Sequence, residues 1–309
     1  MPDRLTVTHH AKVNAPAQVI FDLLADVERW PQFFLPGVHA EYLEREPGSD
    51  LVARWALAGD QVRRWVSRRT LDRAGLSIHQ EQAEPVAPVT AASAHWSLAP
   101  QGETATLVEV RHDIETTAGK ELLAGETDRN GQAQLDSLAE TAENYGDLSE
   151  RVISFEDSLF IGGDTKDVYA FLYEADKWPQ RVDHVSRIDM TEDVPNVQFF
   201  DMDTATPDGV PHTTRSVRLC FPHDLIVYKQ TKLPALLDAH TGHWKLTATP
   251  EGTVASARHT ATIKRSALPL LGDGTTVAGA RRYLRRVLAA NSLNTLRCAK
   301  AYAEERAGV

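Results

Sequence analysis

The stretch DVERWPQ at residues 26–32 returns as EADKWPQ at residues 174–180, which is 148 positions further along the chain. Self-similarity at a fixed spacing indicates a duplicated structural unit. With 309 residues, the chain has the length expected of two ordinary domains. The sequence therefore predicts two tandem copies of one domain, at residues 1–147 and 151–309.

Composition limits the class of protein. The chain is 42% hydrophobic and 25% charged, as is typical of globular proteins. No apolar run reaches the roughly 18 residues of a membrane helix, and the N-terminus lacks the apolar core of a signal peptide. Two cysteines, Cys220 and Cys298, fit a reducing compartment better than a disulfide framework. We therefore expect a cytoplasmic protein that does not interact with membranes.

The net charge of −10 is shared unevenly between the two halves. Residues 1–150 carry 13 basic and 24 acidic side chains, whereas residues 151–309 carry 20 and 19. A nucleic-acid-binding protein needs a basic face, so this balance argues against nucleic-acid binding. The nearly neutral second half is better suited to meet an acidic partner.

The first copy opens with alternating apolar residues at 5–14, which predict a strand. Asn14 and Pro16 then predict the start of a helix that runs to Ala25, with Asn14 as its cap. Because proline disfavours helical geometry in the preceding residue, Pro31 predicts a corner at Trp30.

A meander and a long helix complete each copy. In the first copy a helix is expected at 120–145, after strands at 38–45, 50–58, 62–71, 75–83, 91–99 and 104–115. The second copy repeats this order, with a strand at 152–160, a helix at 165–174, strands to about 264 and a helix at 275–305. This α+β layout predicts two helix-grip domains, in which an antiparallel sheet curls around the final helix and leaves a pocket for an apolar ligand.

One strand of each copy carries an arginine on a face that we expect to be concave. Trp65, Ser67 and Arg69 share one face because side chains alternate along a strand. Ser216 and Arg218 repeat the pattern at an offset of 149. A charge inside a cavity costs several kcal/mol unless an anion or a hydrogen-bond network meets it. A solvent-facing, arginine-rich strand is the alternative, but the repeat favours a pocket.

Two histidine–tryptophan pairs also repeat, as His95-Trp96 and His243-Trp244. Only one member of each pair can point inward. The histidines are candidates for proton transfer, although a histidine at this position is as often a structural residue. His112 returns as His259 with the same ambiguity.

The last helix carries a stripe in which two asparagines interrupt an apolar face. Its members are Ala280, Leu284, Val287, Asn291, Asn294, Cys298 and Ala301. Buried amides need partners, so Asn291 and Asn294 are candidate pocket residues or members of a network that only fixes packing. Cys298 is expected to be a small core residue.

A basic patch lies on the first half of the same helix, at Arg281, Arg282, Arg285 and Arg286. It is either a solvated face or a surface for a phosphate or an acidic carrier. Metal-binding spacings, a glycine-rich phosphate loop and a Gly-x-Ser-x-Gly elbow are all missing from the sequence. We therefore expect no metal and no cofactor.

The duplicated elements Asp-Val-Glu-x-Trp-Pro, Trp-Val-Ser-x-Arg and His-Trp resemble the di-domain aromatase/cyclases of bacterial type II polyketide pathways. The resemblance extends from about Leu5 to Tyr302. It implies an enzyme that takes a poly-β-ketone chain from an acyl carrier protein and cyclises and aromatises its first ring. It further implies a ketoreduced substrate, so that the step includes loss of water from an alcohol.

The resemblance also implies site residues. The pocket motif falls on Trp65, Ser67 and Arg69, and on Ser216 and Arg218, where Thr214 replaces the tryptophan. Further pocket positions fall on Trp96, Trp244, Asn294 and Gln134, and Trp30 and Trp178 are additional substrate-binding candidates. The pocket tyrosine of the family has no match at Gly37 or Val185.

These residues suggest a division of roles. Arg69 and Arg218 would stabilise an oxyanion, Ser67 and Ser216 would donate hydrogen bonds, and His95 or His243 would transfer protons. The tryptophans would shape the cavity. The alternative is a non-catalytic module that binds a lipid, a quinone or another apolar ligand, which predicts cavity walls without convergent polar groups.

Overall fold

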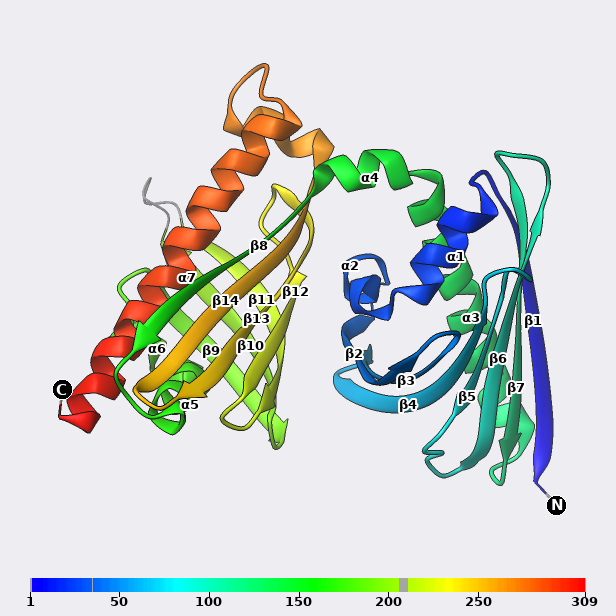
Figure 1. Ribbon diagram of the computed structural model, residues 1–309, viewed down its shortest axis with the longest axis horizontal. Coiled ribbons are helices and arrows are strands. Elements are labelled where there is room, and N and C mark those ends of the chain that lie inside the picture. Colours follow the sequence, from blue (N-terminus) through cyan, green and yellow to red (C-terminus); the bar gives the residue numbers. More distant parts are fainter. Residues whose placement is uncertain (1, 35, 206–210, 309) are drawn as a thin grey trace. The chain divides into compact units, whose positions relative to one another are not determined.

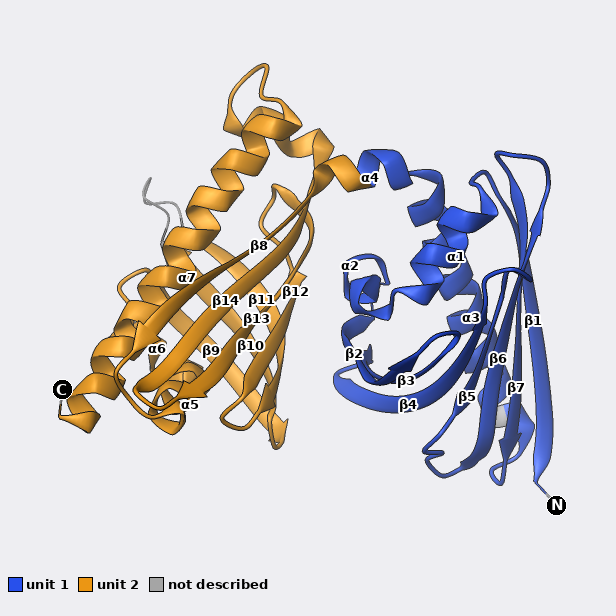
Figure 2. Ribbon diagram, in the orientation of Figure 1, with its two compact units in different colours: residues 1–148 blue, residues 149–309 orange. Residues whose placement is uncertain are grey.

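The computed structural model describes residues 2–34, 36–205 and 211–308. The chain divides into two compact units, Met1–Leu148 and Ser149–Val309, which Figure 2 shows in different colours. Each unit contains one seven-stranded antiparallel sheet that is followed by a long helix (Figure 1). The predicted α+β helix-grip fold is therefore confirmed.

In the first unit the strand order is β1-β7-β6-β5-β4-β3-β2, so the first and second strands form the two edges. The strands are β1 Asp3–Val13, β2 Gly37–Glu46, β3 Ser49–Ala58, β4 Gln61–Asp72, β5 Ser77–Gln82, β6 Val89–Pro100 and β7 Thr106–Thr116. The helices are α1 Ala17–Ala25, the 3₁₀ turn η1 Val27–Arg29, α2 Trp30–Phe33 and α3 Lys120–Glu143. A further helix, α4 Tyr145–Arg151, spans the boundary between the units.

The second unit repeats this topology in the order β8-β14-β13-β12-β11-β10-β9. Its strands are β8 Val152–Ile161, β9 Val185–Val194, β10 Val197–Ala205, β11 Pro211–Phe221, β12 Leu225–Lys232, β13 Leu237–Thr249 and β14 Gly252–Ile263. Its helices are α5 Thr165–Tyr173, η2 Ala175–Lys177, α6 Trp178–Arg181, η3 Arg265–Leu271 and α7 Val277–Ala307. Figure 1 shows α7 running along its sheet.

The two Trp-Pro elements begin short helices. Trp30 has helical angles (φ −55°, ψ −39°), as does Trp178 (φ −60°, ψ −34°), so the predicted non-helical corner is wrong. Proline is tolerated here because the first turn of a helix has no intrahelical acceptor for its N–H. Each indole Nε1 donates a hydrogen bond to the preceding helix, to the carbonyl of Leu23 (2.9 Å) or Phe171 (3.0 Å). The two tryptophans therefore anchor the ends of α1 and α5.

The start of α1 also differs from the prediction. Pro16, and not Asn14, is the residue that precedes the helix, and no side chain caps it. The backbone N–H and the side-chain amide of Asn14 both donate to Glu143 Oε1, at 2.8 and 3.0 Å. Asn14 therefore fastens the end of β1 to the end of α3.

The cores lie between each sheet and its long helix. Leu135, Leu138 and Ala142 of α3 are buried, as their spacing predicts. On α7, Ala280 and Leu284 are buried as predicted. Towards the C-terminus the buried stripe runs instead through Leu296, Ala299 and Ala303, because Asn291, Asn294 and Cys298 are only partly buried and Ala301 is exposed. The predicted core stripe of α7 is therefore right at its start and wrong by a small rotation around the helix in its second half.

Candidate functional site

The first unit contains a cavity of about 730 Å³, a volume typical of small-molecule sites. It lies between the inner face of β2–β4, the α2 segment and α3. Aromatic and apolar side chains form most of its walls. Its lining includes Trp30, Phe34, Pro36, Ala40, Arg54, Trp55, Arg63, Trp65, Glu126, Asn130, Gln134 and Ser137.

Strand register decides which side chains reach this cavity. Directly paired residues of antiparallel strands point to the same face, and Arg54 pairs with Trp65. Ser67 and Arg69 follow at alternate positions of β4, so they share this face. Trp65 lines the cavity, whereas Ser67 and Arg69 are buried beyond its lining.

The guanidinium of Arg69 is fully engaged in structural contacts. Its Nε and one terminal nitrogen donate to the two carboxylate oxygens of Asp50, at 2.7 and 2.6 Å. The terminal nitrogens also donate to the last carbonyls of α1, those of Leu24 (2.9 Å) and Ala25 (2.8 Å). Cations are favoured at helix C-termini, and the Asp50 pair neutralises this one. The expected oxyanion role is corrected: Arg69 joins β3 and β4 to the end of α1.

Arg218 repeats the arrangement with one change. It donates to the carbonyls of Leu172 and Tyr173, both at 3.0 Å, and to the side-chain oxygen of Gln198 at 2.6 Å. Gln198 stands where Asp50 stands in the first copy, and its amide nitrogen donates in turn to Glu192 at 2.8 Å. The negative charge thus lies one side chain further away, and the expected oxyanion role of Arg218 is corrected in the same sense.

Arg54 is a partly buried charged group that does reach the cavity, which the exposed Arg63 and Glu126 also line. Arg54 is not among the residues predicted from the sequence. Its only hydrogen bond within the described residues is a long one, 3.4 Å, to the Ser67 hydroxyl. Its guanidinium carbon lies 5.2 Å from the Trp30 ring, and no carboxylate of the described chain is within ion-pair distance. Burial first, and then the Arg69 charge, lower the Arg54 pKa to about 10, so the group stays protonated at neutral pH.

A pair of histidines lies under α3 on the same inner face. The Cβ of an alanine at Gly131 would come within 2.6 Å of the His9 ring and 3.3 Å of the His112 ring, so both imidazoles pack against this glycine. His9 Nε2 lies 3.1 Å from Asp128 Oδ1. Burial lowers the pKa of His112, and the nearby His9 and Arg54 lower it further. His112 is therefore a neutral imidazole at physiological pH, suited to proton transfer.

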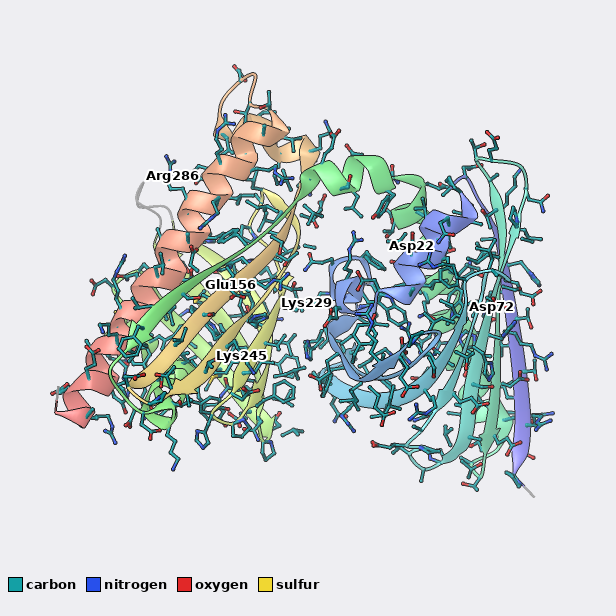
Figure 3. The ribbon with its side chains drawn as sticks, viewed as in Figure 1. Asp22, Asp72, Glu156, Lys229, Lys245 and Arg286 are labelled. Atoms are coloured by element: carbon teal, nitrogen blue, oxygen red, sulfur yellow. The ribbon has the colours of Figure 1, made fainter. Side chains whose placement is uncertain are left out.

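The predicted proton-transfer histidines lie elsewhere. Trp96 and Trp244 point inward and belong to the cores, so His95 and His243 point to the opposite face. His95 is exposed, and His243 Nε2 lies 3.7 Å from Glu156, which is labelled on β8 in Figure 3. The expected role of His95 and His243 inside the cavity is therefore corrected.

Comparison of α7 with α3 shows where the two predicted asparagines of α7 lie. Matching the buried Leu135 with Leu296 gives an offset of 161, which places Asn291 at the position of Asn130, a cavity-lining residue. Asn294 Nδ2 donates to His184 Nδ1 at 3.2 Å. Both asparagines thus belong to the interior-facing side of α7, beside the core stripe. Ser216 and Trp178 are buried in this unit.

Two of the four arginines in the predicted basic patch form hydrogen bonds within the second unit. Arg281 donates to the carbonyls of Glu150 (2.6 Å) and Val152 (2.8 Å), and Arg285 forms a two-pronged pair with Asp157. Arg282 and Arg286 are exposed, and Figure 3 shows Arg286 projecting from α7. The predicted basic patch of four arginines is therefore corrected to two exposed ones, Arg282 and Arg286.

Within the described residues no group of three or more His, Cys, Asp or Glu side chains could hold a metal ion. None of the helices in this part of the chain is long and apolar enough to cross a membrane.

The fold and its cavity define a helix-grip protein, and comparisons with known proteins narrow this class. The family model described as "Polyketide cyclase / dehydrase and lipid transport" matches residues 13–132. The actinorhodin polyketide synthase bifunctional cyclase/dehydratase of Streptomyces coelicolor is 40% identical, over 98% of this chain and 98% of its own. The granaticin counterpart of Streptomyces violaceoruber is 38% identical, over 97% and 94%.

Solved structures agree with these relatives. The di-domain ARO/CYC StfQ from the steffimycin pathway is 51% identical with a TM-score of 0.89, and the match covers 98% of this chain and all of that one. BexL, a di-domain ARO/CYC from the BE-7585A pathway, is 37% identical with a TM-score of 0.87, over 97% and 99%. The chain belongs to the family of di-domain polyketide aromatase/cyclases.

Proposed function

We propose that this protein closes the first ring of a ketoreduced poly-β-ketone and aromatises it by loss of water. The relatives named as bifunctional cyclase/dehydratases support this reaction class. The single observation that carries the site assignment is Arg54, a guanidinium open to an aromatic cavity and without a carboxylate partner among the described residues.

Arg54 is energetically unfavourable for the fold in the absence of a ligand. An unpaired charge held among aromatic side chains destabilises the fold by several kcal/mol unless a ligand compensates it. In aldol ring closure an enol carbon attacks a ketone carbon, and the ketone oxygen becomes an alkoxide as the C–C bond forms. A preorganised guanidinium stabilises this developing charge. Arg54 therefore holds the ketone oxygen, and the Ser67 hydroxyl helps to orient Arg54.

Two further elements complete the proposed site. The aromatic walls, including Trp65 and Trp30, fold the flexible chain so that one pair of carbons meets. Gln134 and Asn130 of α3 offer amide groups for other carbonyls of the chain. His112, neutral and close enough to Arg54 to be influenced by its charge, exchanges the protons.

We also propose that the chain arrives on an acyl carrier protein, in the cytoplasm. Arg63 lines the same cavity but is exposed, so it can meet an acidic carrier at the mouth. Both cysteines are free thiols in the structure, which suits a reducing compartment. A faster reaction of the carrier-bound chain than of the same chain as a free thioester would support carrier recognition.

The test is reconstitution with a minimal polyketide synthase and a ketoreductase. Arg54→Met copies Met202, the residue at the corresponding position of the second copy. We expect about 10²–10³-fold less first-ring product, the effect of losing an oxyanion donor. We expect no loss of folding stability, because an unpaired charge is removed. Arg64→Met is the control, since Arg64 is exposed and pairs with Glu84.

The outcomes separate the alternatives. Wild-type rates for Arg54→Met would refute the role of Arg54. If the products are the same with and without the wild-type protein, the proposed cyclisation and aromatisation activity is refuted. Tight binding of a lipid or quinone without turnover would favour the non-catalytic binding module.

A further inference from the structure

The interior of the second unit contains a hydrogen-bonded chain of polar side chains that the reaction above does not use. Tyr228 Oη lies 2.8 Å from His259 Nδ1, and His240 Nε2 lies 3.1 Å from the same nitrogen. His240 Nδ1 lies 2.9 Å from Gln230 Oε1. The four residues come from β12, β13 and β14.

The Gln230 oxygen sets the direction of every proton in this chain. An amide oxygen only accepts, so His240 Nδ1 carries a proton and the Nε2 of its neutral ring is an acceptor. His259 Nδ1 is therefore the donor, toward His240 Nε2 and toward Tyr228 Oη. Because Tyr228 Oη accepts this N–H, the phenolic proton of Tyr228 is free to be donated elsewhere.

Strand register places this chain on the inner face of the sheet. Tyr228 pairs with the buried Arg218 and with Gly242, and Gly242 pairs with His259. Gly242 makes room both for the neighbouring strand and for the phenol, because a Cβ there would lie 2.2 Å from the Arg258 carbonyl oxygen and 2.3 Å from Tyr228 Oη. Tyr228 and Gln230 are each partly exposed although they point inward.

The hydrogen-bonded chain of Gln230, His240, His259 and Tyr228 is electrically neutral. Burial lowers the pKa of His240 to about 3 and that of His259 to about 4, and it raises the pKa of Tyr228. The charged neighbour of His259 on the packed helix is Arg285, which is paired with Asp157, and His243 adds a smaller influence. The first copy has Gln80 and Ala92 where the second has Tyr228 and His240. The two interiors therefore offer different chemistry: a free cation in the first and a neutral phenol donor in the second.

We propose that the second unit is a proton-donor site for the water-loss step, with Tyr228 as the catalytic residue and His259, His240 and Gln230 as positioning residues. This inference rests on the proposed function and divides its two steps between the units. The substrate class is a β-hydroxy ketone. A water molecule takes the α-proton, the C–H electrons form the C=C bond, and the C–O bond breaks. Tyr228 gives its proton to the departing hydroxyl, which leaves as water. The His259 N–H stabilises the phenolate until water returns the proton.

The test uses the full chain and two substrates. The first is the ketoreduced chain made in situ, and the second is a synthetic β-hydroxy-ketone thioester that bypasses ring closure. Tyr228→Phe removes one oxygen and keeps the aromatic ring. Tyr283→Phe is the matched control, because Tyr283 is an exposed tyrosine of the same unit.

We expect Tyr228→Phe to accumulate ring product that still holds its water, and to slow water loss from the synthetic thioester by about 10²-fold or more. Tyr283→Phe should match the wild type in both assays. Unchanged water loss in Tyr228→Phe would overturn the inference, as would an equal fall of ring closure and water loss. If the wild type closes no ring but removes water from the thioester, the proposed cyclisation fails while the inference stands. If it does neither, both fail.

Discussion

Arg54 and Arg69 differ in what surrounds them, although they lie on the same face of adjacent strands. Arg69 has Asp50 and two helix carbonyls as acceptors, whereas Arg54 has one long hydrogen bond to Ser67. A buried charge with a full set of partners supports the fold, and one without them costs stability. The same residue type thus serves structure at one position and a ligand at the other.

This contrast predicts that replacing Arg69, unlike replacing Arg54, lowers the stability of the fold. Arg69→Met should lower the free energy of unfolding by about 3–5 kcal/mol, because Asp50 would remain buried without its partner. Arg68→Met is the control, since Arg68 is exposed and pairs with Glu44, and it should change stability by less than about 0.5 kcal/mol. Urea denaturation measures both. Equal stability of the two variants would show that the Asp50 pair is not needed.

At the scale of elements, the sequence of α3 depends on the side chains that pack against it. Glycine is unfavourable inside a helix by up to about 1 kcal/mol, yet α3 contains Gly125 and Gly131. Gly131 lies over the His9 and His112 rings, whereas a Cβ at Gly125 would meet only the end of the Arg129 side chain. Only Gly131 is therefore required by packing.

Two alanine variants test this reading of the helix. Gly131→Ala should destabilise the protein by about 1–3 kcal/mol, because its Cβ would overlap the His9 ring. Gly125→Ala should stabilise it by up to about 1 kcal/mol, the difference in helix propensity. Thermal unfolding distinguishes the two. A neutral or stabilising Gly131→Ala would mean that the imidazoles can move away from α3 without cost.

At the scale of the whole molecule, the two units have separate cores and different interiors. The first core is built around Trp96 and Leu135, and the second unit has one cluster around Trp244 and another around Leu237. Among the described residues, only the second interior buries a pair of hydrogen-bonded histidines, His240 and His259. The units should therefore respond differently to acid.

The sign of this response follows from the pKa values. An unfolded histidine binds a proton below about pH 6.5, whereas folded His259 and His240 do so only below about 4 and 3. Between these values the unfolded state binds more protons, so stability rises with pH and falls as the pH drops from about 6.5 to about 4. Hydrogen exchange, read separately for peptides of each unit at pH 7 and pH 5, measures the loss. Replacing both histidines by glutamine should flatten the pH dependence of the second unit, and an unchanged slope would contradict the prediction.

The sequence by itself determined the duplication, the order of strands and helices, and the inward face of Trp65, because periodicity and repeat spacing are local properties of the chain. It also marked Arg69 and Arg218 as inward-facing. Repetition marks polar residues that both copies share, and it does not mark Arg54 because the second copy has Met202 at that position. Strand alternation with Val52, and cross-strand pairing with Trp65, were the signals that pointed to Arg54.

Only the tertiary structure decided which of these groups are free. The hydrogen bonds of the Arg69 guanidinium are made to Asp50 and to the last carbonyls of α1. Strand register and helix packing bring these acceptors next to Arg69. The chain from Gln230 through His240 and His259 to Tyr228 joins three strands, and its proton directions follow from one amide oxygen. Hydrogen-bond partners are set by distances of tenths of an ångström between residues far apart in the sequence. Periodicity shows which face a side chain is on, but it carries no information about which partner that side chain meets there.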